Sequence, residues 1–219
     1  IYSPQLAGRG REKLELESAL HKAIERDELA LHYQPKVDVR SARMVGAEAL
    51  MRWQRGGTLV PPADFIPLAE ESGLILPLSE WALREAARQA RIWQNSFDFA
   101  DAIAVNLPCR VFERSDLIDQ IHQNALNYGI PHRMVQLEIT ETGLMKELQS
   151  VIPSLHRLKD INVEVAIDDF GTGYSSLSYL KRLPLDQLKI DQSFVRDIET
   201  DVNDRGIAEA VISMARVLK

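Results

Sequence analysis

The sequence predicts an α/β fold in which a mostly parallel sheet curls into a TIM-like (β/α)8 barrel with an antiparallel first strand. Apolar strands alternate with helical segments from about residue 102 onward, which is the order of a parallel sheet. Several of these strands also carry polar side chains, and such groups can meet at one place only if the sheet curves. We expect only about six strands of the barrel within the 219 residues.

The N-terminal part predicts a helix followed by a β-hairpin. Residues 29–39 have strand character, and after a turn near Arg40 and Ser41 a second apolar strand follows around Glu48. The short connection indicates that these two strands are antiparallel. Residues 10–27 predict an amphipathic helix that flanks the core, with one apolar stripe made of Leu16, Leu20, Ala23 and Ile24.

The remaining elements follow in a regular order. Helices are expected at 64–71 and 78–95, then a strand at 102–107 and a helix at 116–128 that Gly129 and Pro131 close. A strand at 134–139, a helix at 144–159 and a strand at 163–168 come next. A short helix at 175–183 that ends before Pro184, a strand at 187–190 and a helix at 202–218 complete the chain.

Polar residues interrupt the apolar strands at intervals of about one strand–helix unit. Because side chains alternate between the two faces of a strand, Asn106 points away from Val105 and Leu107. One strand ends in two adjacent aspartates before a glycine-punctuated loop, and for a single such acid a turn residue is the alternative. Recurrence favours one shared polar site, formed by Glu48, Asn106, Glu138, Asp168, Asp169 and Lys189.

Composition excludes several classes of function. A net charge of -6 argues against binding of long nucleic acids, but it allows a small anionic ligand that is held through metal ions. The single Cys109 permits no intrachain disulfide and favours a cytoplasmic location. No apolar run reaches the roughly 20 residues of a membrane span. The first residue is Ile1, so we expect the chain to be part of a longer protein, with the cytoplasmic part of a membrane-anchored parent as the alternative.

Seven sequence blocks, in order, resemble the EAL domain, the bacterial family of cyclic di-GMP phosphodiesterases and receptors. The resemblance runs from about Leu31 to the end of the chain. The blocks are Tyr33-Gln34-Pro35, Glu48-Ala49-Leu50-Met51-Arg52-Trp53, Asp64-Phe65-Ile66-Pro67, Val105-Asn106-Leu107, Leu137-Glu138-Ile139-Thr140-Glu141, Asp168 to Ser176, and Leu188-Lys189-Ile190-Asp191.

The resemblance implies a role for each residue that matches a family motif. It implies that Lys189 is catalytic, that Glu141 holds the loop after Asp169, and that Gln34 and Arg52 contact the nucleotide and its phosphate. The alternatives are a lysine that balances the acids, a glutamate that begins a helix, and an arginine in an interior salt bridge. The implied metal ligands are Glu48, Asn106, Glu138, Asp168 and Asp169. Such hard oxygen ligands suit Mg²⁺ or Mn²⁺, and the adjacent aspartates suit two ions.

The resemblance also implies a domain organisation. Residues 1–28 are similar to the connector helix that joins many family members to an upstream sensory or GGDEF domain, and residues 29–219 form the EAL domain. The chain departs from the family at Pro108-Cys109 and ends before the family's last two strands. A fragment that ended at Lys219 would be expected to be inactive and poorly stable, because its sheet edges would be exposed.

The function that these features predict is metal-dependent hydrolysis of cyclic di-GMP to linear pGpG in bacterial second-messenger signalling, in a homodimer like those of the family. The alternative is a receptor module that binds cyclic di-GMP without cleaving it and relays occupancy to a neighbouring domain. All five visible metal-ligand positions are present, which favours the enzyme. Another Mg²⁺-dependent barrel enzyme would leave the blocks around Glu48 and Asp168 unexplained.

Overall fold

The computed structural model describes residues 4–97, 99–173 and 180–218, in which helices and strands alternate largely as the sequence predicts. The elements are α1 (Pro4–Ala23), β1 (Leu29–Val37), β2 (Met44–Arg55), β3 (Thr58–Val60), α2 (Pro62–Ser72), α3 (Ile75–Phe97), β4 (Ala102–Asn106), α4 (Cys109–Phe112), α5 (Leu117–Tyr128), η1 (His132–Met134), β5 (Val135–Thr140), α6 (Glu141–Lys146), α7 (Leu148–Asp160), β6 (Glu164–Phe170), β7 (Gln187–Ile190), α9 (Gln192–Arg196) and α10 (Val202–Val217).

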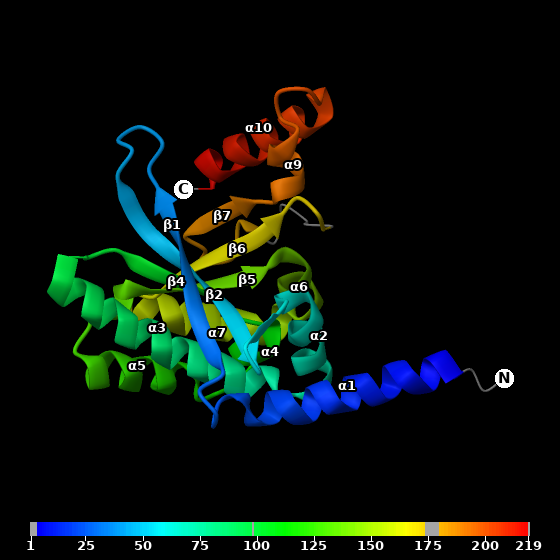
Figure 1. Cartoon of the computed structure of the whole chain (residues 1–219). Helices are drawn as coiled ribbons and strands as arrows, with labels where there is room; N and C mark the ends of the chain where they lie inside the picture. The colour runs from blue at the N-terminus through cyan, green and yellow to red at the C-terminus, as the bar shows by residue number, and fades with distance from the viewer. Residues whose placement is uncertain (1–3, 98, 174–179, 219) are drawn as a thin grey trace.

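One sheet organises the molecule, with the strand order β1-β2-β4-β5-β6-β7 and the short β3 paired to β2 (Figure 1). β1 runs antiparallel to β2, and parallel pairs then join β2 to β4, β4 to β5, β5 to β6 and β6 to β7. The carboxyl ends of the five parallel strands therefore lie along the same edge. That edge is where a parallel sheet places its site.

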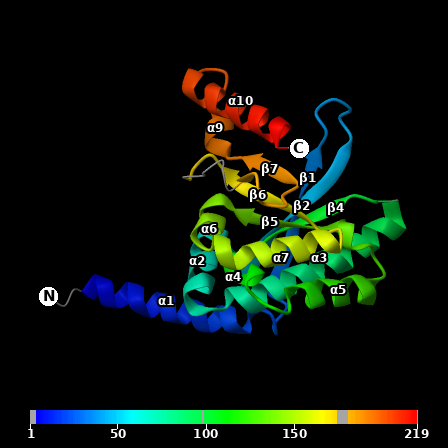
Figure 2. The same ribbon diagram turned by 180° about the vertical axis from the view of Figure 1, so that it is seen from behind.

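The main core lies between this sheet and a layer of helices. α3, α5 and α7 lie together along one face of the sheet in both ribbon views (Figures 1 and 2). Buried aliphatic residues of the strands, such as Ile103 and Leu137, belong to the same cluster as Ala86 of α3 and Leu155 of α7. β5 is buried at five of its six residues, which is expected for a central parallel strand.

A second cluster fixes the N-terminal helix. Leu20 and Ala23 of α1 are buried together with Trp53 of β2 and Phe65 of α2. The indole Nε1 of Trp53 donates a 3.0 Å hydrogen bond to Glu28, just before β1 begins. The C-terminal end of α1 is therefore packed onto the domain, while its N-terminal end extends away from it (Figure 1).

Element boundaries differ from the sequence predictions where local geometry overrides periodicity. The first helix ends at Ala23 rather than at residue 27, and the chain turns through residues 24–27, where Asp27 has a positive φ of 53°, before β1 begins. The helix expected at 144–159 is two helices, since Glu147 has non-helical torsions between α6 and α7. β3, α4, η1 and α9 are too short to give a periodic signal. The helix expected at 175–183 falls largely on residues 174–179, outside the described residues.

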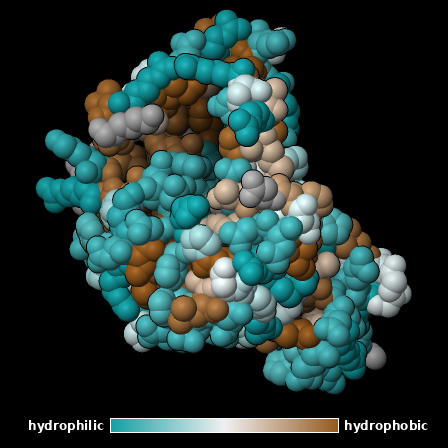
Figure 3. All heavy atoms as spheres, turned by 90° about the vertical axis from the view of Figure 1, so that its left-hand side faces the viewer, coloured by the Kyte–Doolittle hydropathy of each residue, from teal (hydrophilic) through white to brown (hydrophobic). Residues whose placement is uncertain are grey.

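The sheet is not a closed barrel. Within the described residues, β1 pairs only with β2 and β7 only with β6, so both are edge strands. Figure 3, which views the molecule from the side of the β1–β2 hairpin, shows a hollow with hydrophobic walls in the upper part of that face. No helix in the described part of the chain has both the length and the hydropathy needed to span a bilayer.

Candidate metal centre and adjoining pocket

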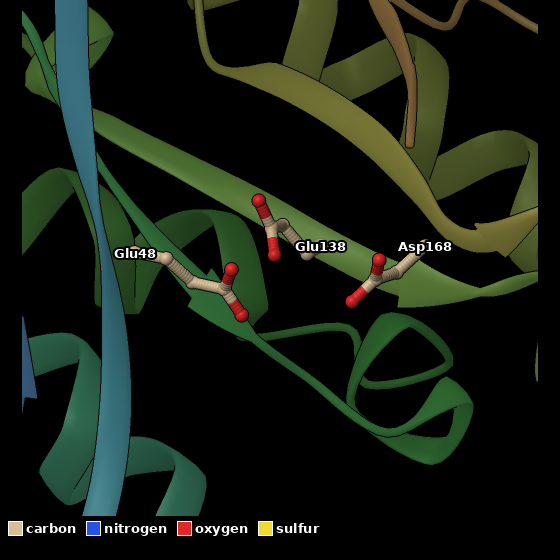
Figure 4. Close-up of side chains that lie close together, drawn as sticks. All are labelled: Glu48, Glu138 and Asp168. Carbon is tan, nitrogen blue, oxygen red and sulfur yellow. The ribbon is translucent and has the colours of Figure 1, made fainter. Parts of the chain in front are cut away.

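Three carboxylates from three strands converge at the carboxyl edge of the sheet. Glu48 of β2, Glu138 of β5 and Asp168 of β6 each place an oxygen within 4.8 Å of the others, and their side chains point toward one another in Figure 4. The sheet register produces this meeting: Glu138 pairs with Asn106 on β4, and Asp168 pairs with Thr140, two residues beyond Glu138. Residues on one face of neighbouring parallel strands therefore share one site.

Lys189 of β7 lies among the three carboxylates. Its Nζ is 2.5 Å from Glu138 Oε2, 3.0 Å from Asp168 Oδ2 and 3.1 Å from Glu48 Oε2. Burial alone would lower the pKa of Lys189, but the hydrogen bond to Glu138 and the surrounding negative charges outweigh it and raise that pKa. The ammonium group is therefore the counter-ion of the carboxylates in this structure.

Glu138 is the most enclosed of these acids, with no exposed surface. Desolvation raises its pKa, although Lys189 opposes the shift. Its Oε2 accepts the hydrogen bond from Lys189, whereas its Oε1 has no hydrogen-bond partner within residues 4–97, 99–173 and 180–218. Lys36 Nζ lies 3.7 Å from Oε1. A buried carboxylate oxygen without a hydrogen-bond donor is available as a ligand to a cation.

Asn106 extends the ligand set. Its Nδ2 donates a 2.8 Å hydrogen bond to Glu48 Oε1, so that its carbonyl oxygen stays available to a cation. Asn106 is the last residue of β4 and is exposed, although the three residues before it are buried. The side chains of Asn106 and Glu48 thus orient each other.

The two adjacent aspartates do not point in the same direction. A register irregularity between Ile167 and Phe170 of β6 contains both, and Asp169 has a positive φ of 54°. The backbone N–H of Asp169 donates a 3.0 Å hydrogen bond to Asp168 Oδ1. Desolvation, followed by the charges of Asp168 and Asp191, raises the pKa of Asp169. Asp169 is thus adjacent to the cluster of three carboxylates rather than a member of it.

Glu141 anchors the start of the loop that follows Asp169. It is almost fully buried, and its Oε2 accepts hydrogen bonds from the backbone N–H groups of Gly171, at 2.7 Å, and Gly173, at 3.2 Å. A Cβ on Gly173 would lie 3.0 Å from the Glu141 carboxyl group, so the close approach favours glycine. Glu141 also begins α6, in agreement with its alternative role at a helix start.

A pocket of about 320 Å³ adjoins the carboxylates. Asn106 and Glu138, which belong to the candidate metal centre, also line this pocket. Arg52, four residues after Glu48 on β2, lines it, and no ion pair of Arg52 occurs in the part of the chain that the structure describes. The other walls are mostly apolar, including Leu50, Ile66, Ile75 and Leu107. Gln34 is exposed on β1 directly opposite Glu48.

The donor set fits a hard divalent cation. The groups that could ligate a cation are carboxylate and amide oxygens, and one buried carboxylate oxygen has no donor among the described residues. The positions of Glu48, Asn106, Glu138 and Asp168 would hold such an ion. Carboxylates packed in this way repel each other unless cations compensate them.

The structure brings together Glu48, Asn106, Glu138, Asp168 and Lys189 from the predicted site, and it places Asp169, Arg52 and Gln34 around them. Sequence reasoning missed Lys36, which reaches Glu138 from β1, and Asp191, which lies beside Asp169. A signal for Lys36 was present, since it follows Gln34 by two residues and therefore lies on the same face of the strand.

Comparisons with known proteins agree with this architecture. The family model described as the EAL domain matches residues 17–219. The chain is 40% identical to the bifunctional diguanylate cyclase/cyclic di-GMP phosphodiesterase MucR of Pseudomonas aeruginosa, over 100% of this chain and 32% of that protein. It is 36% identical to the cyclic di-GMP phosphodiesterase PdeR of Escherichia coli, over 100% of this chain and 33% of that protein.

The chain therefore spans about a third of the length of these curated relatives. Among solved structures, the PaMucR phosphodiesterase in complex with c-di-GMP matches with a TM-score of 0.88 and 41% identity, over 93% of this chain and 83% of that one. The family model covers almost the whole chain, and the fold and the sequence agree with it. This chain belongs to the EAL domain family.

Proposed function

We propose that the full-length protein to which this EAL domain belongs hydrolyses cyclic di-GMP to linear pGpG with the help of two divalent metal ions, Mg²⁺ or Mn²⁺. The observation that supports this most strongly is the convergence of Glu48, Glu138, Asp168 and Lys189 beside a pocket lined by Arg52. Relatives of this chain are named cyclic di-GMP phosphodiesterases, and a similar solved structure holds c-di-GMP. In the reaction, water adds to one phosphorus, its P–O3′ bond breaks, and the 3′ oxygen takes up a proton.

The acidic residues would hold the ions. When bound, such ions lower the pKa of water and offset the charge that develops on the phosphate. Glu48, Asn106, Glu138 and Asp168 would supply the oxygens for them, together with Asp169. Glu141 would keep the backbone after Asp169 in place through the amides of Gly171 and Gly173.

The remaining residues would bind and orient the substrate. The Nζ of Lys189 is a positive donor in the centre of the site, so it can orient the attacking water or a phosphate oxygen. Arg52 offers a planar guanidinium for a second phosphate oxygen, and the apolar pocket walls suit the flat faces of a guanine base. Gln34, opposite Glu48, would contact the nucleotide at the rim.

The receptor alternative is supported less well. A module that only binds the nucleotide has no need of converging carboxylates with a lysine among them. In this chain the four ligand positions Glu48, Asn106, Glu138 and Asp168 all face one site, and Lys189 contacts three of them. We therefore propose hydrolysis rather than binding alone.

Several wider assignments accompany this proposal. We propose that the open sheet is part of a TIM-like barrel with β1 as its antiparallel strand, and that α1 connects residues 29–219 to an upstream sensory or GGDEF domain. The buried C-terminal end of α1 supports this connection. A homodimer and a cytoplasmic location stay predictions.

The test is turnover of cyclic di-GMP in the presence of Mn²⁺, with separation of the cyclic and linear nucleotides by chromatography. We expect pGpG from the wild-type protein and a loss of at least about 100-fold in rate for Glu48→Ala, since a metal ligand is removed. Arg88→Ala is the matched control, because Arg88 forms its ion pair with Glu85 on helix α3. Undiminished turnover of Glu48→Ala would refute the metal assignment, and nucleotide binding without any product would favour the receptor.

A further inference from the structure

Lys36 enters the site from the antiparallel strand β1. It approaches Oε1 of Glu138, whereas Lys189 contacts Oε2. Its Nζ is 3.7 Å from Glu138 Oε1 and donates a hydrogen bond to Gln136 Oε1. The Lys36 side chain is only 24% exposed, and that of Glu138 is fully buried. The proposed reaction assigns no role to Lys36, although it is a second partly buried ammonium at the acidic site.

The backbone is shaped to admit this lysine. Gly46 lies opposite Lys36 in the β1–β2 ladder, and a Cβ at Gly46 would be 2.8 Å from the carbonyl oxygen of Ala102 and 3.2 Å from Lys36 Cε. Gly46 also has a φ of 145°, which residues with a side chain rarely adopt. The space next to Gly46 is therefore filled by the aliphatic part of the Lys36 side chain rather than by a side chain of β2.

Two lysines divide the oxygens of Glu138 between them. Lys189 contacts Oε2, and it also contacts one oxygen each of Glu48 and Asp168, so it occupies the oxygens that a cation at this centre would need. Lys36 instead approaches Oε1. A cation at the centre therefore competes with the contacts of Lys189, whereas Lys36 is held by its hydrogen bond to Gln136 and lies 3.7 Å from Glu138 Oε1.

Lys36 is itself held in place by two successive hydrogen bonds, from Lys36 to Gln136 and from Gln136 to Glu164. Gln136 of β5 is 1% exposed, accepts the hydrogen bond from Lys36, and donates a 3.0 Å hydrogen bond to Glu164 Oε2 of β6. The order Glu164, Gln136, Lys36, Glu138 runs from the opposite end of the strands up to the metal centre. A lysine held in this way has a defined position from which to orient a carboxylate.

We propose that Lys36 is a positioning residue that holds Glu138 in its metal-ligating orientation. The proposal rests on the proposed metal-dependent function and names a residue that acts through Glu138 rather than on the substrate. A simple charge effect predicts the opposite sign, because removal of a nearby positive charge strengthens the binding of a cation. The sign of the change in metal affinity therefore distinguishes positioning from charge.

The first measurement is the Kd for Mn²⁺ of the full chain by isothermal titration calorimetry without nucleotide. We expect Lys36→Met, which keeps the length of the side chain, to raise this Kd at least about tenfold, as loss of groups that orient metal ligands does. Lys13→Met is the matched control, because Lys13 pairs with Glu71 far from the site. An unchanged or lower Kd for Lys36→Met overturns the proposal.

Gln136→Leu is the second variant, and it decides the question if Lys36→Met does not fold. It removes the anchor of Lys36 without changing any charge, so we expect a Kd for Mn²⁺ that is raised by a smaller factor, about threefold to tenfold. A bare charge effect predicts no change for this variant. An unchanged Kd for Gln136→Leu therefore counts against positioning.

A double-mutant cycle, measured by thermal unfolding in EDTA, tests whether Lys36 acts through Glu138. We expect Lys36→Met to lower the Tm of the metal-free protein, and the shift to shrink by at least half in a Glu138→Gln background. An equal shift in both backgrounds would show that Lys36 acts elsewhere. If instead the wild-type protein binds no Mn²⁺, the metal-dependent function fails, and positioning of a metal ligand fails with it. If the wild-type protein binds Mn²⁺ and the variants bind it with the same Kd, only the positioning role of Lys36 is refuted, and the metal-dependent function stands.

Discussion

Replacement of Lys189 by methionine separates the role of this lysine as a counter-ion from its proposed role in the reaction. The ammonium is within 3.1 Å of one oxygen each from Glu48, Glu138 and Asp168. Methionine fills a similar volume but carries no charge. The metal-free variant therefore has three carboxylates around one point without the cation that now joins them.

The size of the effect follows from burial. Removal of one partner of a buried ion pair costs about 3 to 5 kcal/mol, because the other charge is left unpaired. Lys189, Glu48 and Asp168 are 25%, 18% and 19% exposed, so water screens part of the loss, and we expect about 2 to 3 kcal/mol. For a domain of this size, that corresponds to a decrease in Tm of about 4 to 12 °C.

Metal ions should reverse much of this loss. A cation and Lys189 compete for the same carboxylate oxygens, so the variant should bind Mn²⁺ more tightly than the wild type and gain more in Tm from it. Its turnover of cyclic di-GMP should nevertheless fall by about 10² to 10³, the cost of one lost donor in an active site. Tighter metal binding with lower activity is thus the expected combination.

The assay is thermal unfolding in EDTA and over a Mn²⁺ titration, followed by single-turnover hydrolysis. Lys159→Met serves as the control, because Lys159 forms a more exposed ion pair with Asp186 at the other end of the strands. If the metal-free Lys189→Met protein melts at or above the wild-type temperature and Mn²⁺ stabilises both equally, the carboxylates do not depend on Lys189. The reasoning from the three contacts would then be wrong.

Three further predictions concern the surroundings of the site. Gly173→Ala places a methyl group 3.0 Å from the Glu141 carboxyl group, so we expect at least about tenfold lower turnover with little change in Tm, measured by hydrolysis and thermal unfolding. Burial raises the pKa of Cys109 from 9.0 to about 11, so at pH 8 a disulfide reagent should label the folded protein about 100-fold more slowly than the unfolded one; comparable rates would contradict the burial. Because this pKa is raised on folding, the associated stability is fully present below about pH 9 and is lost as the pH rises through about 11. Trp53→Ala removes a fully buried ring and its hydrogen bond to Glu28, so urea unfolding should show a loss of about 3 to 5 kcal/mol, and a loss below about 1 kcal/mol would contradict the packing of α1.

Sequence reasoning reached the strands that carry the site because their pattern is local. An apolar strand interrupted by one polar residue is visible in six residues, and β5, with Glu138 between Leu137 and Ile139, is an example. The alternation with helices then required a parallel sheet, and the structure confirms four parallel strand pairs. Short elements such as β3 and α9 left no such pattern.

The candidate site was predicted less completely than the sheet. The meeting of Glu48, Glu138, Asp168 and Lys189 was expected, since parallel strands bring their carboxyl ends to one edge. The backbone conformation of Asp169 was not expected, because its positive φ lies inside an irregular part of β6. A backbone torsion of this kind has no signature in a sequence that lacks glycine at the position.

The sequence by itself determined which polar residues interrupt the apolar strands and on which face of each strand they lie, because alternation along a strand is fixed by the covalent geometry of the chain. Only the tertiary structure decided which oxygens meet which cations. Lys36 contacts Glu138 because the β1–β2 register places it over Gly46, where a missing side chain leaves room. That contact joins residues about a hundred positions apart, and such distances are set by strand pairing and packing rather than by any local pattern.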